Sequence, residues 1–295
     1  MNISQRPLVV VMGTAVRLPP FPIAVLWLSL LLLNLSCVYY TLLPMSQGNT
    51  ADDWRVLTNA ADHGLRSGLY AGGLYQWSPL LVPLLQLLSP LGVLGWRLLH
   101  LLAAMLMPSW TLRLLVLVSW PFWFDVSVGN AVVFIVLAGA WALRGSRFAS
   151  LAFLALTLLI PRPLMVPLAM WLLWQRPELR VPALVLAVLL AAATVLTGLT
   201  AEWVGTLLHS ASTTQSWRAG GGGWDFNIGP SRALGVWWLA IGIPLAVWLT
   251  WKGRVGWASV AASPYVLPYY LLLLFLELVR PAPLAVHARI PQVAA

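Results

Sequence analysis

The sequence predicts an all-α membrane protein, a polytopic helical bundle with about eight to ten membrane helices, some of them short and broken. Three observations support this fold class. Hydrophobic residues make up 60% of the 295 positions and charged residues only 8%. Mean hydropathy is +0.85, a value typical of membrane proteins rather than soluble domains. Long apolar runs alternate with short polar loops, and no stretch is long and polar enough to form a separate soluble domain.

The first apolar segment, residues 21–43, follows a short tail at residues 1–20. It is longer than the 7–15 residues of a typical signal-peptide core, and no small-residue cleavage site follows, so we expect a retained helix. Cys37, the only cysteine, excludes an internal disulfide. We expect one membrane domain at residues 21–279 and a tail at residues 280–295. Further apolar segments cover residues 79–107, 110–124, 131–143, 148–174, 181–200, 233–251 and 255–278.

Two of these segments are too long for one crossing, because about 20 helical residues span a bilayer core of about 30 Å. Residues 148–174 are interrupted by Pro161-Arg162-Pro163. Two short helices that meet at Arg162 fit this pattern, since a charge inside a lone membrane helix is costly and broken helices are tolerated beside a protein cavity. In residues 79–107, Ser89-Pro90 predicts a kink or turn.

The net charge of +9 indicates topology rather than nucleic-acid binding, because the basic residues are dispersed among short loops. Under the positive-inside rule, arginine pairs beside the apolar segments place the N-terminus in the cytoplasm. We expect a multi-pass protein of a prokaryotic plasma membrane, with outer loops at residues 45–78 and 201–232. Six of the eight acids then lie on or near the outer face: Asp52, Asp53, Asp62, Asp125, Glu202 and Asp225.

The acidic pair Asp52-Asp53 follows the first apolar segment, in a chain with only eight acidic residues. A carboxylate at the membrane boundary, partly shielded from water, has its pKa raised toward the range of a general base. The alternative is a solvated loop acid. Arg162, held between two prolines, suits a lipid-linked phosphate because arginine binds phosphate bidentately. Its alternative is an interface anchor.

Two outer loops have an unusual composition. Residues 64–80 are rich in Gly, Tyr and Trp, which indicates either interface anchors or a stacking surface for a sugar or acceptor. The loop at residues 201–232 contains four consecutive glycines, which indicates a mobile cover over a substrate or a plain linker. The four histidines show no ligand spacing, so we expect no metal and no other cofactor.

Taken together, these motifs resemble the GT-C class of integral-membrane glycosyltransferases, specifically the mannosyltransferase-like glycosyltransferase family 87. The resemblance spans residues 21–278. Asp53 to Ala60 looks like the family's Asp-Phe-x-x-Tyr-x-x-Ala opening, and Gly129-Asn130 stands where the family has Gly-Gln. Arg162 takes the place of Lys in Ile-Lys-Pro, and Asn227 begins an Asn-x-Ser-like segment. Further similar elements are Gly68-Leu-Tyr70, Trp77-Ser-Pro79-Leu and Ser263 to Tyr270.

The resemblance implies a GT-C-like fold and the transfer of a sugar, often mannose, from a polyprenyl-phosphate donor to a lipid or glycan acceptor outside the cytoplasm. Asp53 would act as general base with inversion, and Arg162 would stabilise the departing lipid phosphate. The other expected substrate-binding residues are Asp52, Asn130, Asp225, Asn227, Arg232 and Tyr269.

The chain also departs from the family pattern. Arg162 replaces a lysine, Tyr269 replaces a histidine, and the chain is short for the family. A noncatalytic relative of the same fold is therefore one alternative. A small-molecule or lipid transporter is another, although transporters often pair broken helices across two halves and we see no matched second half.

Overall fold

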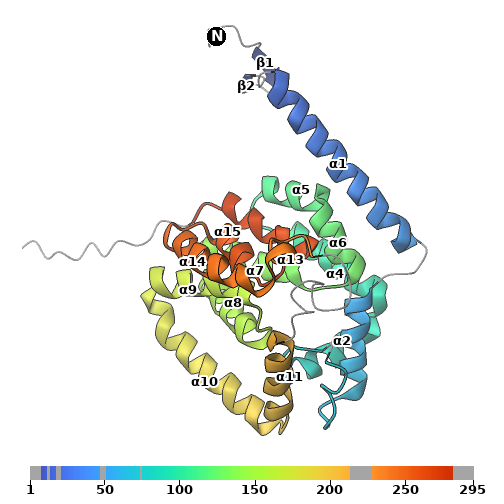
Figure 1. Cartoon of the computed structure of the whole chain (residues 1–295), viewed down its shortest axis with the longest axis vertical. Helices are drawn as coiled ribbons and strands as arrows, with labels where there is room; N and C mark the ends of the chain where they lie inside the picture. Colours follow the sequence, from blue (N-terminus) through green and yellow to red (C-terminus); the bar gives the residue numbers. More distant parts are fainter. Residues whose placement is uncertain are drawn as a thin grey trace, which may run out of the picture. The chain divides into compact units, whose positions relative to one another are not determined.

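The computed structural model describes residues 8–11, 14–17, 21–46, 51–73, 75–212 and 227–281. This part of the chain is almost entirely helical, which confirms the predicted all-α class (Figure 1). The chain divides into two compact units, Met1–Asn49 and Thr50–Ala295.

The first unit contains a hairpin and a long helix. Strands β1 (Leu8–Val11) and β2 (Thr14–Arg17) pair antiparallel. We predicted only a tail here, but both strands are rich in β-branched valine and threonine, which favour extended backbone. Helix α1 (Phe21–Ser46) holds the free thiol of Cys37 and includes the candidate membrane span Ile23–Leu43.

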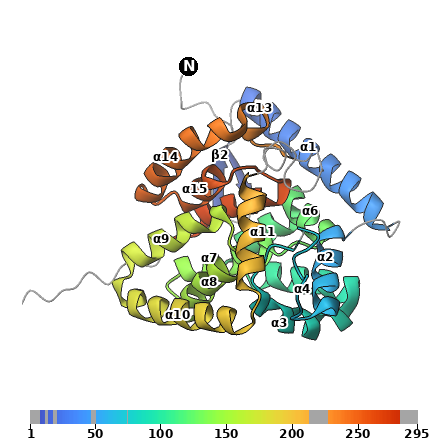
Figure 2. The ribbon, with the colours of Figure 1, turned by 60° about the horizontal axis from the view of Figure 1, so that its bottom comes forward.

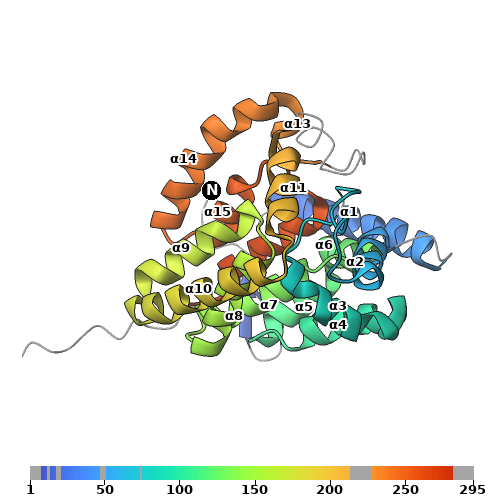
Figure 3. The same ribbon diagram turned by 90° about the horizontal axis from the view of Figure 1, so that it is seen from below.

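The second unit begins with α2 (Asp52–His63), which lies inside the predicted outer loop at residues 45–78. Its buried residues Trp54, Leu57, Ala60 and Ala61 form one apolar strip along an otherwise polar helix. Helix α2 contacts α3 (Val82–Leu88), and Figure 3 shows the two helices side by side. The predicted turn at Ser89-Pro90 is confirmed as a 3₁₀ turn between α3 and α4; the surrounding elements are η2 (Pro79–Leu81), η3 (Ser89–Leu91) and α4 (Gly92–Met105).

The middle of the chain contains the predicted break at Arg162. Helix α8 (Arg147–Leu159) ends just before it, and η4 (Pro163–Met165) with α9 (Val166–Gln175) begins just after it. Residue 162 itself is extended, so two short helices meet there as predicted. The preceding helices are α5 (Trp110–Val118), α6 (Trp120–Val128) and α7 (Val132–Leu143).

The last predicted segment, residues 255–278, is not continuous. Helix α15 (Val255–Ala262) ends before an extended stretch, and the 3₁₀ helix η7 (Pro268–Leu278) follows. Pro264 and Pro268 explain the break, because the residue before a proline is driven out of the helical region. Figure 2 shows α15 beside α9 and α14 (Trp238–Trp251), and these helices also contact each other. The remaining elements are η5 (Pro177–Leu179), α10 (Arg180–Leu196), α11 (Thr200–Ser212), α13 (Ser231–Leu234) and η6 (Gly235–Trp237).

Helix lengths in the described residues support a polytopic membrane protein. Four helices are long and apolar enough to cross a bilayer: Ile23–Leu43, Pro79–Met105, Pro177–Leu196 and Ser231–Trp251. Helices α5 and α6 form a bent pair at 66°, and four further apolar helices are only 10–17 residues long. Counted as one span, the bent pair gives five candidate spans in these residues, and the predicted number of eight to ten membrane helices stays a prediction.

Candidate functional site

The start of α2 separates the two neighbouring acids. Trp54 stacks on Trp96 of α4, with ring centroids 4.6 Å apart, and this contact orients the first turn of α2. Asp53 consequently points toward α6 and η7. The Asp52 side chain is 44% exposed and pairs with Arg55 at 3.3 Å. Only one acid of the pair is therefore built into the interior of the second unit.

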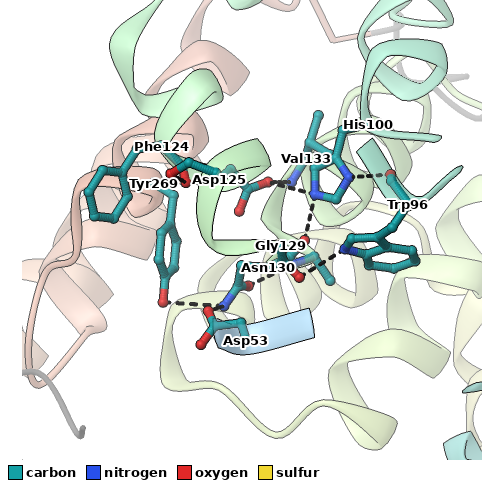
Figure 4. A network of polar contacts seen from close by, with 11 residues as sticks. Asp53, Trp96, His100, Phe124, Asp125, Gly129, Asn130, Val133 and Tyr269 are labelled. Carbon is teal, nitrogen blue, oxygen red and sulfur yellow. Dashed lines mark hydrogen bonds and ion pairs between the residues drawn. The ribbon is translucent and has the colours of Figure 1, made fainter. Parts of the chain in front are cut away.

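Asp53 contacts Asn130, the residue that follows the C-terminal end of α6. The Asn130 Nδ2 group donates a 2.6 Å hydrogen bond to Asp53 Oδ2 and a 3.2 Å bond to the hydroxyl of Tyr269 (Figure 4). Asn130 Oδ1 accepts from the backbone N–H of Ala131 at 2.7 Å. Because the amide oxygen is occupied by a backbone donor, the NH₂ group must face the carboxylate. Three predicted site residues thus meet in one cluster.

Gly129 lets α6 and α2 come this close. Its φ of 74° ends α6 in the left-handed conformation, a common glycine C-cap. A Cβ at this position would lie 2.7 Å from Trp54 Cβ. The Gly129 carbonyl also accepts a 2.9 Å bond from Trp96 Nε1, so α4 holds the same turn.

The environment of Asp53 favours a protonatable carboxyl group. Burial raises the pKa of Asp53, while the Asn130 hydrogen bond and the positive charge of Arg162 act in the opposite direction. The net pKa is above the ordinary value. A carboxylate whose pKa is shifted this way takes up a proton more readily, which is the property of a general base.

Arg162 lies near the same cluster. Its Nη1 donates a 2.8 Å hydrogen bond to the hydroxyl of Tyr265, and its charge acts on Asp53. Within the described residues, Asp53 and Arg162 form no direct ion pair, and no second hydrogen bond of the guanidinium is found. A guanidinium has five N–H donors, so most of its capacity to bind an anion is not used by the described chain.

Tyrosines surround Arg162. Tyr265 comes from the extended stretch before η7, and Tyr269 and Tyr270 come from the first turn of η7. The rings of Tyr265 and Tyr270 stack at 6.0 Å, and Tyr269 stacks on Phe124 at 6.0 Å. Both η7 tyrosines are buried.

The remaining predicted binding residues lie outside this cluster. Asn227 is fully buried, and its Oδ1 accepts from the backbone N–H groups of Gly229 and Val266 at 2.9 and 3.0 Å. It therefore ties the start of α13 to the stretch that carries Tyr265. Arg232 is exposed on α13. For both residues, substrate binding stays a prediction, and Asp225 and the four glycines lie outside the described residues.

The aromatic loop after α2 is packed rather than open. Tyr70, Tyr75 and Trp77 are buried, and the two tyrosine hydroxyls donate to the carbonyls of Trp77 and Ser78 at 2.9 and 3.1 Å. Burial leaves little ring surface for stacking on a sugar. Glu202 on α11 accepts bonds from Ser67 Oγ and Gly68 N at 2.9 and 3.0 Å, so the loop is tied to α11.

The structure adds residues that sequence reasoning missed. Asp125, which we placed near the outer face, is fully buried in α6, and its Oδ2 accepts from Val133 N at 2.9 Å. His100 of α4 is also fully buried and lies 3.8 Å from Asp125. Ionisable residues inside apolar helices signal a functional or paired group, a signal already present in the sequence.

Within the described residues, no three His, Cys, Asp or Glu side chains are grouped to hold a metal ion. No family model matches this chain, and no curated protein or solved structure is significantly similar to it.

Proposed function

We propose that this protein is a membrane glycosyltransferase that moves a sugar from a polyprenyl-phosphate donor to a lipid or glycan acceptor at the outer face. Mannose is the sugar that the family resemblance favours. The observation that carries the proposal is the meeting of Asp53, Asn130 and Tyr269 from three distant elements, with the Arg162 cation acting on the same carboxylate.

The reaction needs a base for the acceptor hydroxyl. Asn130 occupies Asp53 Oδ2, while Oδ1 makes no hydrogen bond with the described residues. In the proposed step Oδ1 takes the acceptor proton as the acceptor oxygen attacks the anomeric carbon. The bond from that carbon to the phosphate oxygen breaks, and its electron pair leaves with the lipid phosphate, so the anomeric configuration inverts.

The leaving group needs a cation. Within the described residues Arg162 makes one hydrogen bond, to Tyr265, and its fork geometry matches two phosphate oxygens. Its charge would stabilise the negative charge that develops on the departing lipid phosphate. A donor with an isoprenoid tail dissolves in the bilayer, so apolar helices suffice to receive it and no nucleotide-binding domain is required.

We infer the orientation of the protein in the membrane from the pairs of basic residues beside the apolar helices. We infer a cytoplasmic N-terminus and a multi-pass protein of a prokaryotic plasma membrane, with α2 on the outer side. The partners in this proposal are membrane lipids, the lipid-linked donor and the acceptor, with no nucleic acid and no cofactor.

The test uses purified protein in liposomes with radiolabelled polyprenyl-phosphate mannose and a membrane lipid extract as acceptor. Asp53→Asn should lower transfer by about 100-fold or more while donor binding stays unchanged, because general-base catalysis contributes on this scale. Asp52→Asn is the matched control: because Asp52 is exposed and paired with Arg55 rather than with Asn130, we expect it to lower transfer far less than Asp53→Asn does.

Two outcomes would contradict the proposal. Sugar transfer by Asp53→Asn at the wild-type rate would exclude Asp53 as the general base. Donor binding by the wild type without transfer to any acceptor in the extract would favour the alternative of a lipid-handling protein or a noncatalytic relative.

A further inference from the structure

His100 is held between two carbonyl oxygens. Its Nδ1 lies 2.8 Å from the carbonyl oxygen of Trp96, and its Nε2 lies 2.6 Å from that of Asn130 (Figure 4). Carbonyl oxygens only accept hydrogen bonds, whereas a neutral imidazole has one N–H and one lone pair. A neutral ring would therefore place its lone pair against one of the two oxygens. Both contacts are satisfied only if both ring nitrogens carry protons.

Asp125 supplies the opposite charge. Its Oδ2 lies 3.8 Å from His100 Nε2, and both side chains are fully buried. Asp125 Oδ1 is buried without a hydrogen-bond partner among the described residues. An unpaired carboxylate in such a place costs several kcal/mol, and a neighbouring cation offsets this cost.

We propose that His100 and Asp125 form a buried imidazolium–carboxylate pair that positions Asn130 and, through it, the Asp53 carboxylate. The positioning role rests on the proposed function, whereas the charge state of the pair does not.

The pair holds both sides of the α6–α7 junction. His100 donates to the Asn130 carbonyl, and Asp125 accepts from Val133 N in the first turn of α7. Trp96 adds the bond to the Gly129 carbonyl. Contacts from α4, α6 and α7 therefore hold the backbone that carries the Asn130 side chain, and the amide of this side chain donates to Asp53.

The other charged groups around the pair are few. The positive charge of Arg97, also on α4, opposes a positive charge on His100. The carboxylate of Asp53 on α2 adds negative charge near Asp125. On η7, the titratable group Tyr269 is hydrogen-bonded to the Asn130 amide. Helix α7 contributes no titratable side chain. Asp125 is therefore the group that compensates an imidazolium here.

Selective ¹⁵N-histidine labelling tests the charge state directly, because the chain has only four histidines. His100→Gln identifies the His100 signals in the full-length protein in detergent. We expect both ring nitrogens of wild-type His100 to be protonated at neutral pH, and one of them to lose its proton in Asp125→Asn. A single protonated nitrogen on wild-type His100 would overturn the pair, and beyond the His100→Gln assignment this result needs no further variant.

Kinetics test the positioning role. His100→Gln retains a donor group but removes the charge, and we expect kcat to fall about ten-fold with the donor KM changed less than two-fold, as for one misplaced hydrogen bond. The acid limb of the pH–rate profile should move to higher pH. If His100→Gln changes neither the acid limb of the pH–rate profile nor kcat, the positioning role of His100 is overturned. If the wild type transfers no sugar, the proposed function fails while the ¹⁵N result still decides the pair.

Discussion

Asn130 donates a 2.6 Å hydrogen bond to Asp53 and thereby joins the end of α6 to the start of α2. The same amide group reaches Tyr269 of η7. One side chain therefore links three elements that are far apart in the chain, and it contacts the carboxylate that we propose as the base.

Replacing Asn130 by leucine should move the acid limb of the activity profile to higher pH. The Asn130 bond favours the charged form of Asp53 and lowers its pKa, so without that bond the carboxyl group stays protonated to a higher pH. The pH–rate profile of kcat measures the shift. Asn130→Gln retains a donor and should shift the limb less; equal profiles for all three proteins would contradict the role of this bond.

Asp53→Asn should raise the thermal stability of the protein at neutral pH. Burial raises the pKa of Asp53, so the folded state binds this proton more tightly than the unfolded state, and stability decreases as pH rises through that pKa. The variant never carries the buried charge. The Tm of the variant should exceed that of the wild type at neutral pH. This difference should shrink as the pH falls toward the ordinary pKa of a carboxyl group.

Asp52→Asn is the control for this stability measurement. It loses only an exposed pair with Arg55, which is worth about 0–1 kcal/mol. Its Tm should therefore stay close to the wild-type value at both pH values. A neutral-pH gain as large as that of Asp53→Asn would show that the effect comes from net charge rather than burial.

Arg162→Ala should weaken donor binding more than Arg162→Lys does. Lysine keeps the positive charge, whereas the alanine variant loses both the charge and the bidentate geometry for phosphate. The bond to Tyr265 is also lost. Binding of labelled polyprenyl-phosphate mannose to the purified variants measures this order. Arg66→Ala removes an exposed cation and should leave binding unchanged; equal affinities for all variants would make Arg162 an interface anchor.

Gly129→Ala should destabilise the protein and disrupt the Asp53 contact. The added Cβ would lie 2.7 Å from Trp54 Cβ, in a backbone with φ of 74°. We expect a loss of about 2–5 kcal/mol, combining overpacking of about 1–3 kcal/mol with a left-handed penalty of about 1–2 kcal/mol. Thermal unfolding and transfer activity measure the two effects.

Gly198→Ala separates the two causes. Gly198 has nearly the same φ, 73°, but no atom of the described chain lies within 4 Å of the position that an added Cβ would take. Its free energy of unfolding should fall only by the left-handed penalty of about 1–2 kcal/mol, and it should retain activity. Equal losses at the two glycines would show that packing against Trp54 contributes nothing.

Local sequence features predicted much of the fold. Composition identified a helical membrane protein, and Pro161-Arg162-Pro163 identified the break between α8 and α9, because proline acts on its own backbone and on its neighbour. The apolar strip of α2 was also present in the sequence, but the polar residues between its members led us to predict a loop rather than a helix. The split between α15 and η7 was missed although Pro264 and Pro268 signal it.

The candidate site was predicted only in part. Asp53 was named from the acidic pair and from the family resemblance, Asn130 and Tyr269 from the resemblance alone, and the structure brings the three together. Asn227 was also named, yet its side chain ties backbone segments together. His100 and Asp125 received no role, because their significance depends on which carbonyls and charges surround them after folding.

The sequence by itself determined that this chain is an all-α membrane protein, that it breaks at Arg162, and that its few carboxylates require an explanation. Only the tertiary structure decided that Asp53 turns inward while Asp52 faces outward, and that Asn130 holds the former. The physical reason is the distance along the chain over which each effect acts. Hydropathy and proline sterics act within a few residues, whereas a hydrogen bond between α2 and the end of α6 exists only after both helices have packed.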